Sequence, residues 1–347
     1  MLALVSVESL VPPGHPLREL KPLVDGVLRR LSDDFDAMYA EGGRPSIPPE
    51  RLLKAEVLIA LYSIRSETLF CEQLGYNLLY RWFLDMDLQD TPFDRSTFSK
   101  NRQRLLKADI ARRFFDEAVG LAREGGFLSS EHFSVDGSMI EAWASIKSFR
   151  SKDDDGDNNS FPDFRGQKRS NETHESKTDP EARLKRKGNG QGAKLCYEAH
   201  ILIENRNGLV TDYELTQASG TAERDAAGEM VSRLPKRRRR ATIAADKAYD
   251  TKDFVRKCRK HRATPHVAQN QHARRRSAID GRTTRHRGYG VSTSKRLLVE
   301  KVFGWMKTTA GFRRTRFRGR QKTAAAGAMV VATYNLLRIK NLQAAPA

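Results

Sequence analysis

The 347-residue sequence predicts a helical N-terminal region followed by a mixed α/β layer. From Leu17 to about Glu124 the apolar residues recur at helical spacing. That pattern stops around Gly125, and the chain then alternates between short apolar runs and helical segments, which indicates a layered α/β architecture rather than a bundle or a barrel. We therefore expect a helical domain at residues 1–128 and an α/β domain at 129–347.

The charge is unevenly divided along the chain. There are 62 basic and 43 acidic residues, a formal net charge of +19 and a pI of about 10.0. Residues 1–130 carry a net charge of −2 and residues 131–347 a net charge of +21. Such an excess favours an anionic partner, with nucleic acid the default candidate, and that partner should meet mainly the later part of the chain.

Cysteine usage and hydropathy favour a cytoplasmic protein. Cys71, Cys196 and Cys258 are widely separated and indicate neither a disulfide framework nor a zinc site. The N-terminus has no secretory signal pattern. The longest uncharged apolar segment, Thr323–Leu337, is shorter than the roughly 20 residues that a membrane span needs, so it predicts a buried helix. When bound to DNA, such a protein would be associated with the nucleoid.

Within the helical region, residues 46–64 (SIPPERLLKAEVLIALYSI) carry a clear start signal. Pro48 and Pro49 precede Glu50, and both residue types are favoured in a first helical turn. We expect a helix to begin there.

A basic helix is predicted within DRSTFSKNRQRLLK. Ser96 or its neighbour Thr97 can cap it, and Lys100, Arg102 and Arg104 follow. This arrangement is typical of the DNA-recognition helix of a helix-turn-helix motif. The alternative is a packing helix whose basic face is merely solvated.

The first strand of the α/β domain is HFSVDGS, residues 132–138, whose apolar members alternate. We expect the strand to finish on Asp136, just before Gly137. Asp followed by Gly is also common turn chemistry, so a purely structural role for Asp136 is the alternative.

Residues 151–192 are rich in Asp, Asn, Ser, Lys and Gly and poor in aliphatic side chains. Such a segment buries too little surface to offset its ordering entropy. We expect a polar, flexible insert that interrupts the α/β domain.

The remaining elements follow from periodicity and composition. Residues 194–204 and 208–217 form a predicted hairpin of β-branched and aromatic strands. Residues 241–245 form a compact apolar strand that ends in Asp246. Further helices are expected at 221–234, 250–261, 292–312 and 323–342, with another strand at 263–269. His132, His200 and His266 lie on or beside strands, where a structural role is expected.

Asp136 and Asp246 each end a short apolar strand, the position where α/β folds place functional groups. If the two strands are neighbours, both carboxylates emerge at one edge of the sheet and can share divalent cations. Hard oxygen ligands of this kind favour magnesium or manganese.

A third acidic candidate lies on the helix near residue 300. Taking about 100° per residue and Arg296 as zero, Glu300 falls near 40° and Lys307 near 20°. Phe303 falls near −20° beside them, while the other apolar side chains form a broad face from about 180° to 300°, with Leu297 flanking it near 100°. This predicts a metal-binding Glu300 bracketed by two phosphate-binding cations. The alternative is an ordinary solvated face. Trp305 falls on the apolar side, as a core residue would.

Four segments carry a resemblance to a known family: FSVDGSMIEAWASIKSF, RSNETHESKTDPEARLKRKG, ADKAYD and RLLVEKVFGWMKT. They resemble the DDE transposases of bacterial insertion sequences, specifically the insertion-sequence-five-like branch. The segments GRPSIPPERLLKAEVLIALYSIRSETLFCEQLGYNLLYRWFL and STFSKNRQRLL are similar to the helical domain that precedes the catalytic part. The resemblance extends from about Val11 to Leu342.

The resemblance implies a ribonuclease-H-like fold, with Asp136, Asp246 and Glu300 as the catalytic and metal-binding triad. Arg296 and Lys307 match the Arg and Lys of the wider Tyr-Arg-Glu-Lys signature. The Tyr of that signature falls at a threonine here, Thr293, with Tyr289 four residues earlier.

The implied activity is cleavage and strand transfer of DNA with two magnesium or manganese ions. In-line displacement at phosphorus builds charge on the entering and leaving oxygens, and two ions about 3.5–4 Å apart stabilise both. Partners would be double-stranded DNA, as the terminal inverted repeats and the target, with a homodimer or larger assembly on DNA. The alternatives are a non-enzymatic DNA-binding protein derived from a transposase, or a metal-dependent nuclease without joining activity.

The DNA track is predicted from three basic stretches, RRTRFRGRQK, PKRRRR and ARRR. In the first of them the candidate phosphate contacts are Arg313, Arg314, Arg316 and Arg318. Affinity based on such contacts falls steeply with salt. A solubilising surface is the alternative interpretation.

Overall fold

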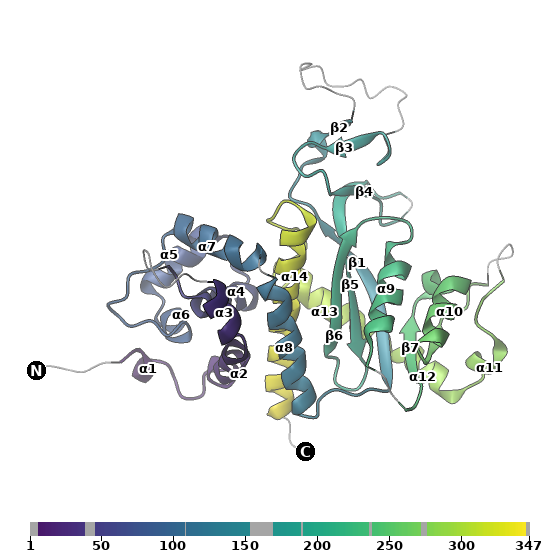
Figure 1. Ribbon diagram of the computed structural model, residues 1–347, viewed down its shortest axis with the longest axis horizontal. Coiled ribbons are helices and arrows are strands. Elements are labelled where there is room, and N and C mark those ends of the chain that lie inside the picture. The colour runs from purple at the N-terminus through teal and green to yellow at the C-terminus, as the bar shows by residue number, and fades with distance from the viewer. Residues whose placement is uncertain are drawn as a thin grey trace, which may run out of the picture.

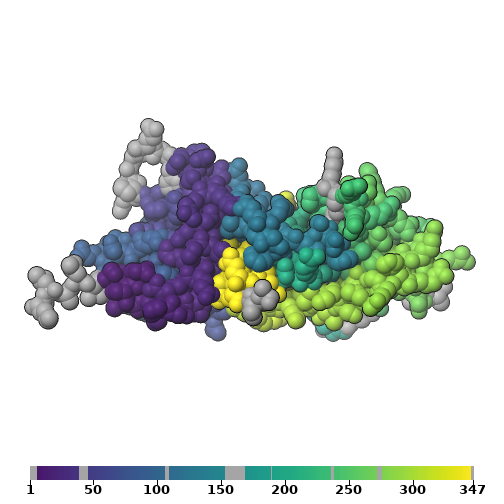
Figure 2. Space-filling view, turned by 90° about the horizontal axis from the view of Figure 1, so that it is seen from below, coloured from purple at the N-terminus to yellow at the C-terminus, as the bar shows by residue number. Residues whose placement is uncertain are grey.

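The computed structural model describes residues 6–38, 46–107, 109–152, 169–188, 190–235, 238–271 and 276–344. A helical region lies at one side of the molecule and a mixed sheet at the other, with α8 and α14 running side by side between them (Figure 1). Seen from below, the C-terminal segment, in yellow, lies between the purple N-terminal region and the green part of the sheet domain (Figure 2).

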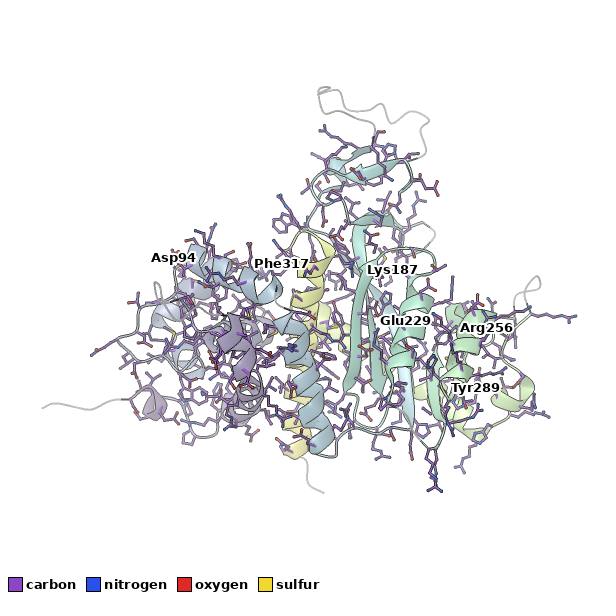
Figure 3. The ribbon with its side chains drawn as sticks, in the orientation of Figure 1. Asp94, Lys187, Glu229, Arg256, Tyr289 and Phe317 are labelled. Atoms are coloured by element: carbon purple, nitrogen blue, oxygen red, sulfur yellow. The ribbon has the colours of Figure 1, made fainter. Side chains whose placement is uncertain are left out.

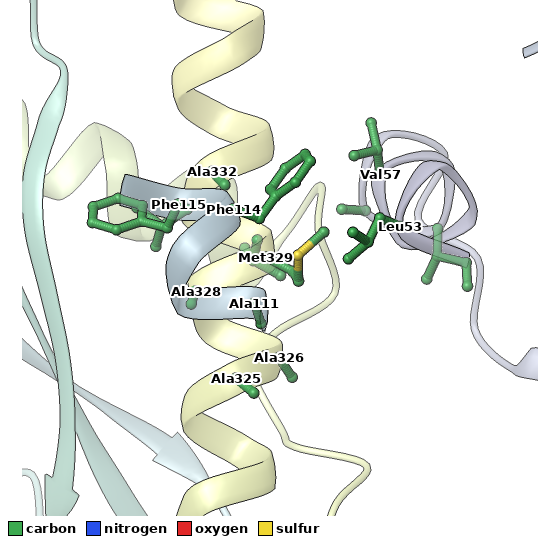
Figure 4. Packing of buried hydrophobic residues seen from close by; sticks show 14 of the residues in the cluster. Leu53, Val57, Ala111, Phe114, Phe115, Ala325, Ala326, Ala328, Met329 and Ala332 are labelled. Carbon is green, nitrogen blue, oxygen red and sulfur yellow. The ribbon is translucent and has the colours of Figure 1, made fainter. Parts of the chain in front are cut away.

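The predicted helical region is confirmed. Its interior is apolar, because the buried faces of helices such as α4 and α8 consist mainly of apolar side chains. Phe114 of α8 lies beside Met329 of α14, with Leu53 and Val57 of α4 opposite, whereas Phe115 points to the other side of α8 (Figure 4). The helices are α1 (Val7–Leu10), α2 (Leu17–Arg30), α3 (Ser32–Met38), α4 (Pro49–Leu61), α5 (Glu67–Tyr76), α6 (Leu78–Phe83), α7 (Arg95–Lys107) and α8 (Ile110–Glu124).

The main sheet has six strands: β1 (His132–Glu141), β4 (Arg183–Lys185), β5 (Lys194–Glu204), β6 (Val210–Gln217), β7 (Ala241–Ala245) and β8 (Ala263–Val267). β1 is central, antiparallel to β5 and parallel to β7. β6 pairs with β5 on the far side, and β8 lies parallel to β7. The order β6-β5-β1-β7-β8, with helices on both faces, is the ribonuclease-H-like fold that the sequence predicted.

Two groups of helices cover the sheet. One face packs against α9 (Ala222–Arg233) and α10 (Lys252–Lys260) through a separate apolar cluster. The other face meets α12 (Arg287–Lys295), α13 (Leu298–Lys307) and α14 (Arg320–Gln343). The short elements are η1 (Ile146–Ser148), β2 (Phe149–Ser151), β3 (His174–Ser176), η2 (Lys247–Tyr249) and α11 (Gly281–Thr284). No helix in the described part of the chain is both long and apolar enough to cross a membrane.

The expectation that the first strand finishes on Asp136 was wrong. β1 continues to Glu141, and the residue pair that resembled a turn lies inside the strand, where Asp136 is paired with Ile201 and Gly137 with His200. The eleven-residue β5 supplies hydrogen-bonding partners along the whole of β1, so the ladder has no reason to stop at the glycine.

The expectation of a flexible insert at 151–192 was wrong for residues 169–188. They form β3 and β4, and β4 extends the main sheet. Buried Asp179 accepts hydrogen bonds from the Tyr197 hydroxyl at 2.7 Å and from the Gly319 amide at 3.2 Å, which fixes the segment against β5 and the start of α14. Residues 153–168 and 189 of the insert lie outside the described part.

Candidate active site

The sheet brings Asp136 and Asp246 side by side. β1 and β7 are parallel, with Ser134 opposite Ala244. Two residues further along that register, Asp136 comes level with Asp246, which directly follows β7. The Asp246 carboxylate also accepts a hydrogen bond from the Ala248 amide at 2.7 Å and so caps the short helix after the strand.

Asp136 lies in an environment that disfavours its negative charge. Burial raises its pKa to about 6; the amide of Gly137, at 2.9 Å, opposes this shift, whereas the nearby Asp246 reinforces it. Arg296 supplies the compensating charge, with its guanidinium 3.8 Å from the Asp136 carboxylate. Two adjacent carboxylates with one partial counter-charge form a site suited to a cation.

α13 docks onto β1 through its basic residues. The Lys307 ammonium donates a hydrogen bond to Ser138 at 2.6 Å, and Arg296 just before the helix contacts Asp136. Burial, reinforced by Lys187 and Arg313, lowers the pKa of Lys307. The predicted cation pair therefore lies along the same strand that carries the first carboxylate.

Glu300 is exposed on α13. Nowhere in the described residues do three acidic, histidine or cysteine side chains come close enough together to hold a metal ion. The convergence expected of the three carboxylates is thus seen for Asp136 and Asp246 only. These hard oxygen donors suit magnesium or manganese, and Glu300 follows Arg296 by four residues on the helix that reaches Asp136.

The prediction that Arg102 contacts DNA was wrong. Its side chain is buried, forms ion pairs with Glu56 at 3.1 Å and with Glu67, and lies over the ring of Phe317 at 4.7 Å. Phe317 lies between the helical region and the sheet (Figure 3). The neighbouring Lys100 and Arg104 are exposed and remain candidates.

Two arginines of the 313–322 stretch are held by the protein itself. Arg314 donates to the carbonyls of Ala142 and Trp143, at 3.1 and 2.7 Å, and half-buried Arg316 donates to Ile64 at 2.6 Å. Each guanidinium has further N–H donors besides these, and Arg314 is exposed, so their role as phosphate contacts stays a prediction. Arg313 and Arg318 are exposed. In the other basic stretches, residues 236, 237 and 273–275 lie outside the described part.

A basic pocket that the sequence did not predict lies on the α12 side of the sheet. Its volume is about 580 Å³, and it is lined by His132 at the start of β1 and by Arg206, His286, Arg287 and Lys295. His286 and Arg287 are adjacent in the sequence, which is a weak basic signal. Arg206, however, lies on a loop about eighty residues earlier in the chain, so sequence spacing does not connect it with them. Only the fold joins them.

Tyr289 and the strand histidines have structural partners. The Tyr289 hydroxyl donates to the Val267 carbonyl at 2.9 Å, and its ring packs edge-on against buried His266. His266 contacts Ser292, and His132 contacts Thr242. Thr293, at the Tyr position of the signature, bonds to the Tyr289 carbonyl.

Two family profiles match the chain. Residues 163–336 match the Transposase DDE domain, and residues 5–104 match the Transposase domain (DUF772). The first match covers half of the chain and includes Asp246 and the α13 residues, so this protein belongs to the DDE transposase family.

A search of solved structures returns transposase complexes at low identity and low TM-score. The piggyBac transposase synaptic complex with hairpin DNA is 10% identical, with a TM-score of 0.42, over 95% of this chain and 76% of that one. The Mos1 strand transfer complex is 11% identical (TM-score 0.20, 84% and 86% covered), and the Mos1 mariner paired end complex with Mn is 13% identical (0.21, 90% and 86%). No curated protein sequence matches the chain.

Proposed function

We propose that this protein is the transposase of an insertion sequence of the insertion-sequence-five-like branch. It binds the ends of its element, cleaves the DNA there and joins the released ends to a target. The observation that carries the proposal is the placement of Asp136 beside Asp246, with Arg296 and Lys307 of one helical segment against the same strand. The exposed basic surface supplies the phosphate contacts.

Asp136, Asp246 and Glu300 are the residues that would hold two magnesium or manganese ions. When bound, such ions stabilise charge on the entering and leaving oxygens of the phosphodiester. Arg296 holds the Asp136 carboxylate in place and is positioned to turn to a phosphate. Lys307, whose pKa is lowered by burial, offers a second phosphate contact beside Ser138.

We infer a division of labour between residues 1–128 and 129–347. The helical part binds the terminal repeats, with Lys100 and Arg104 as its exposed candidates, and the later part carries the chemistry. Exposed Arg313 lies close enough to Lys307 to act on its charge, and exposed Arg318 is a further candidate phosphate contact. Since two ends are brought together in transposition, the active form on DNA is at least a homodimer.

The test is an incubation of purified protein with labelled element-end DNA and magnesium. Joined product is expected. Cut product alone would indicate a nuclease without joining activity, and bound but intact DNA a non-enzymatic binding protein.

Asp246→Asn is expected to lower the cleavage rate by at least about a hundredfold, because a neutral amide replaces one negatively charged carboxylate of the site. The matched control is Asp253→Asn, since Asp253 is an exposed acid on the next helix, α10, and pairs there with Arg256 three residues later. Equal activity in Asp246→Asn and wild type would refute the assignment.

A further inference from the structure

A fourth acidic residue lies against the site from the opposite face of the sheet. Glu223, in the first turn of α9, approaches the backbone of Gly137, the residue after Asp136. A Cβ atom at Gly137 would lie 2.9 Å from the Glu223 Cγ and 3.0 Å from the His200 Nδ1. A side chain at this position would force Glu223 or His200 to shift, so the glycine of the DG pair that resembled a turn permits this close approach.

Two buried polar atoms beside Glu223 lack a protein partner among the described residues. His200 is fully buried; its Nε2 bonds to the Thr216 hydroxyl at 2.8 Å, and its Nδ1 faces Gly137 without a partner. The hydroxyl of fully buried Tyr249 is also unpaired. Burial, reinforced by Asp136, Glu223 and Asp246, raises its pKa. Unpaired buried polar atoms are costly and imply an absent partner such as ordered water.

The present counter-charge of Glu223 comes from the insert. Lys185 on β4 lies 4.0 Å from the Glu223 carboxylate and forms a close ion pair with buried Glu198. Lys185 is therefore shared between two acids, and its contact with Glu223 is the longer one. Arg296, at 3.8 Å from Asp136, is the corresponding cation on the other face.

Magnesium keeps several of its waters in proteins and is bound directly through only one or two carboxylates. Residues one water layer away then matter, and changing them costs about 10–100-fold in affinity. This agrees with the finding that no three acidic, histidine or cysteine side chains of the described residues are close enough for direct ligation.

We propose that Glu223 is a further acidic residue of the metal-binding site, acting on the cation at Asp136 and Asp246 through hydrogen-bonded water. The proposal rests on the function proposed above. Tyr249 and His200 hold the same water layer through their free hydroxyl and Nδ1. Lys185 restrains Glu223 in the metal-free protein and competes with the cation for its charge.

The experiment is calorimetric titration of the full-length, DNA-free protein with Mn²⁺. Glu223→Gln is expected to weaken Mn²⁺ binding about tenfold, since an outer-layer carboxylate is lost. Lys185→Gln is expected to tighten it, and this gain should vanish when both changes are combined. Asp225→Asn, an exposed acid in the same helical turn, is the control and should stay within about twofold of wild type.

A merely structural Glu223, present only to pair with Lys185, predicts the opposite pattern: neither variant changes Mn²⁺ affinity, and both lower the melting temperature. That result overturns the proposal. If Glu223→Gln does not fold, Lys185→Gln tests the proposal alone: tighter Mn²⁺ binding supports it, and unchanged or weaker Mn²⁺ binding overturns it. Asp246→Asn distinguishes a failure of the proposed function from a failure of the role of Glu223. Unchanged Mn²⁺ affinity in Asp246→Asn refutes the proposed function itself. Weaker Mn²⁺ binding in Asp246→Asn, together with unchanged binding in Glu223→Gln, refutes only the role of Glu223.

Discussion

Replacing Arg102 by Met should destabilise the protein without weakening its phosphate contacts. The Arg102 guanidinium forms ion pairs with both Glu56 and Glu67, and all three side chains are largely buried, with exposures of 8% for Arg102, 15% for Glu56 and 20% for Glu67. Removing one member of a buried ion-paired set costs about 3–5 kcal/mol, because the other charges stay buried and unpaired. Loss of the contact with the Phe317 ring adds roughly 0.5–2 kcal/mol.

The assay is urea unfolding followed by far-ultraviolet circular dichroism, with exposed Arg104→Met as the matched control. We expect a loss of about 4 kcal/mol for Arg102→Met and less than about 0.5 kcal/mol for the control. Binding of element-end DNA is then measured against salt. A phosphate contact would lower the slope of log K against log salt by about one unit. A loss under about 1 kcal/mol together with that drop in slope would restore Arg102 as a DNA contact.

Three further outcomes are expected. Gly327→Ala should cost about 1–3 kcal/mol in urea unfolding, since an added Cβ overlaps the Tyr213 hydroxyl, and an unchanged midpoint contradicts this packing. Burial lowers the pKa of His200 to about 3 and that of His266 to about 4. The stability that these two histidines contribute is therefore complete above pH 6.5, and it is lost as the pH falls because acid protonates them in the unfolded chain first. Between pH 6 and 4.5 the two histidines together contribute a loss of about 2.7 kcal/mol per pH unit, which Asp136, with its pKa raised to about 6, partly offsets. His200→Asn should therefore lower the measured slope by about 1.4 kcal/mol per pH unit, and an unaltered slope argues against this account. Arg318→Gln should lower the slope of log K for DNA binding against log salt by about one, and a slope equal to that of wild type would show that Arg318 does not contact a phosphate.

The strands and helices were predictable because their signals are local. The sequence runs of β5 and β7 coincide with the observed strands, Lys194–Glu204 and Ala241–Ala245, since compact apolar and β-branched runs have few other uses. The end of β1 was not predictable. Whether an Asp-Gly pair turns or stays extended depends on the partner strand, and β5 lies more than fifty residues further along the chain.

The site shows the same limit. The placement of Asp136 beside Asp246 follows from the end of β7 and the parallel register of β1 and β7, which a sequence can suggest. The burial of Arg102 could not be predicted in this way, because the acids that neutralise it, Glu56 and Glu67, come from other helices. Spacing on a helix shows which residues share a face but says nothing about what covers that face.

The segment after Lys307 joins α13 to the helical region. Ser63 donates a hydrogen bond to the Thr309 carbonyl, Arg316 donates to Ile64, and the ring of Phe317 lies against Arg102. These contacts begin two residues beyond the end of α13, whose basic residues already contact β1. Any displacement of the helical region is therefore passed to the helix that carries Glu300, because close-packed contacts transmit movement instead of absorbing it. Arg102→Met, although remote from the carboxylates, loosens this connection, so its effect on cleavage should exceed its effect on DNA affinity.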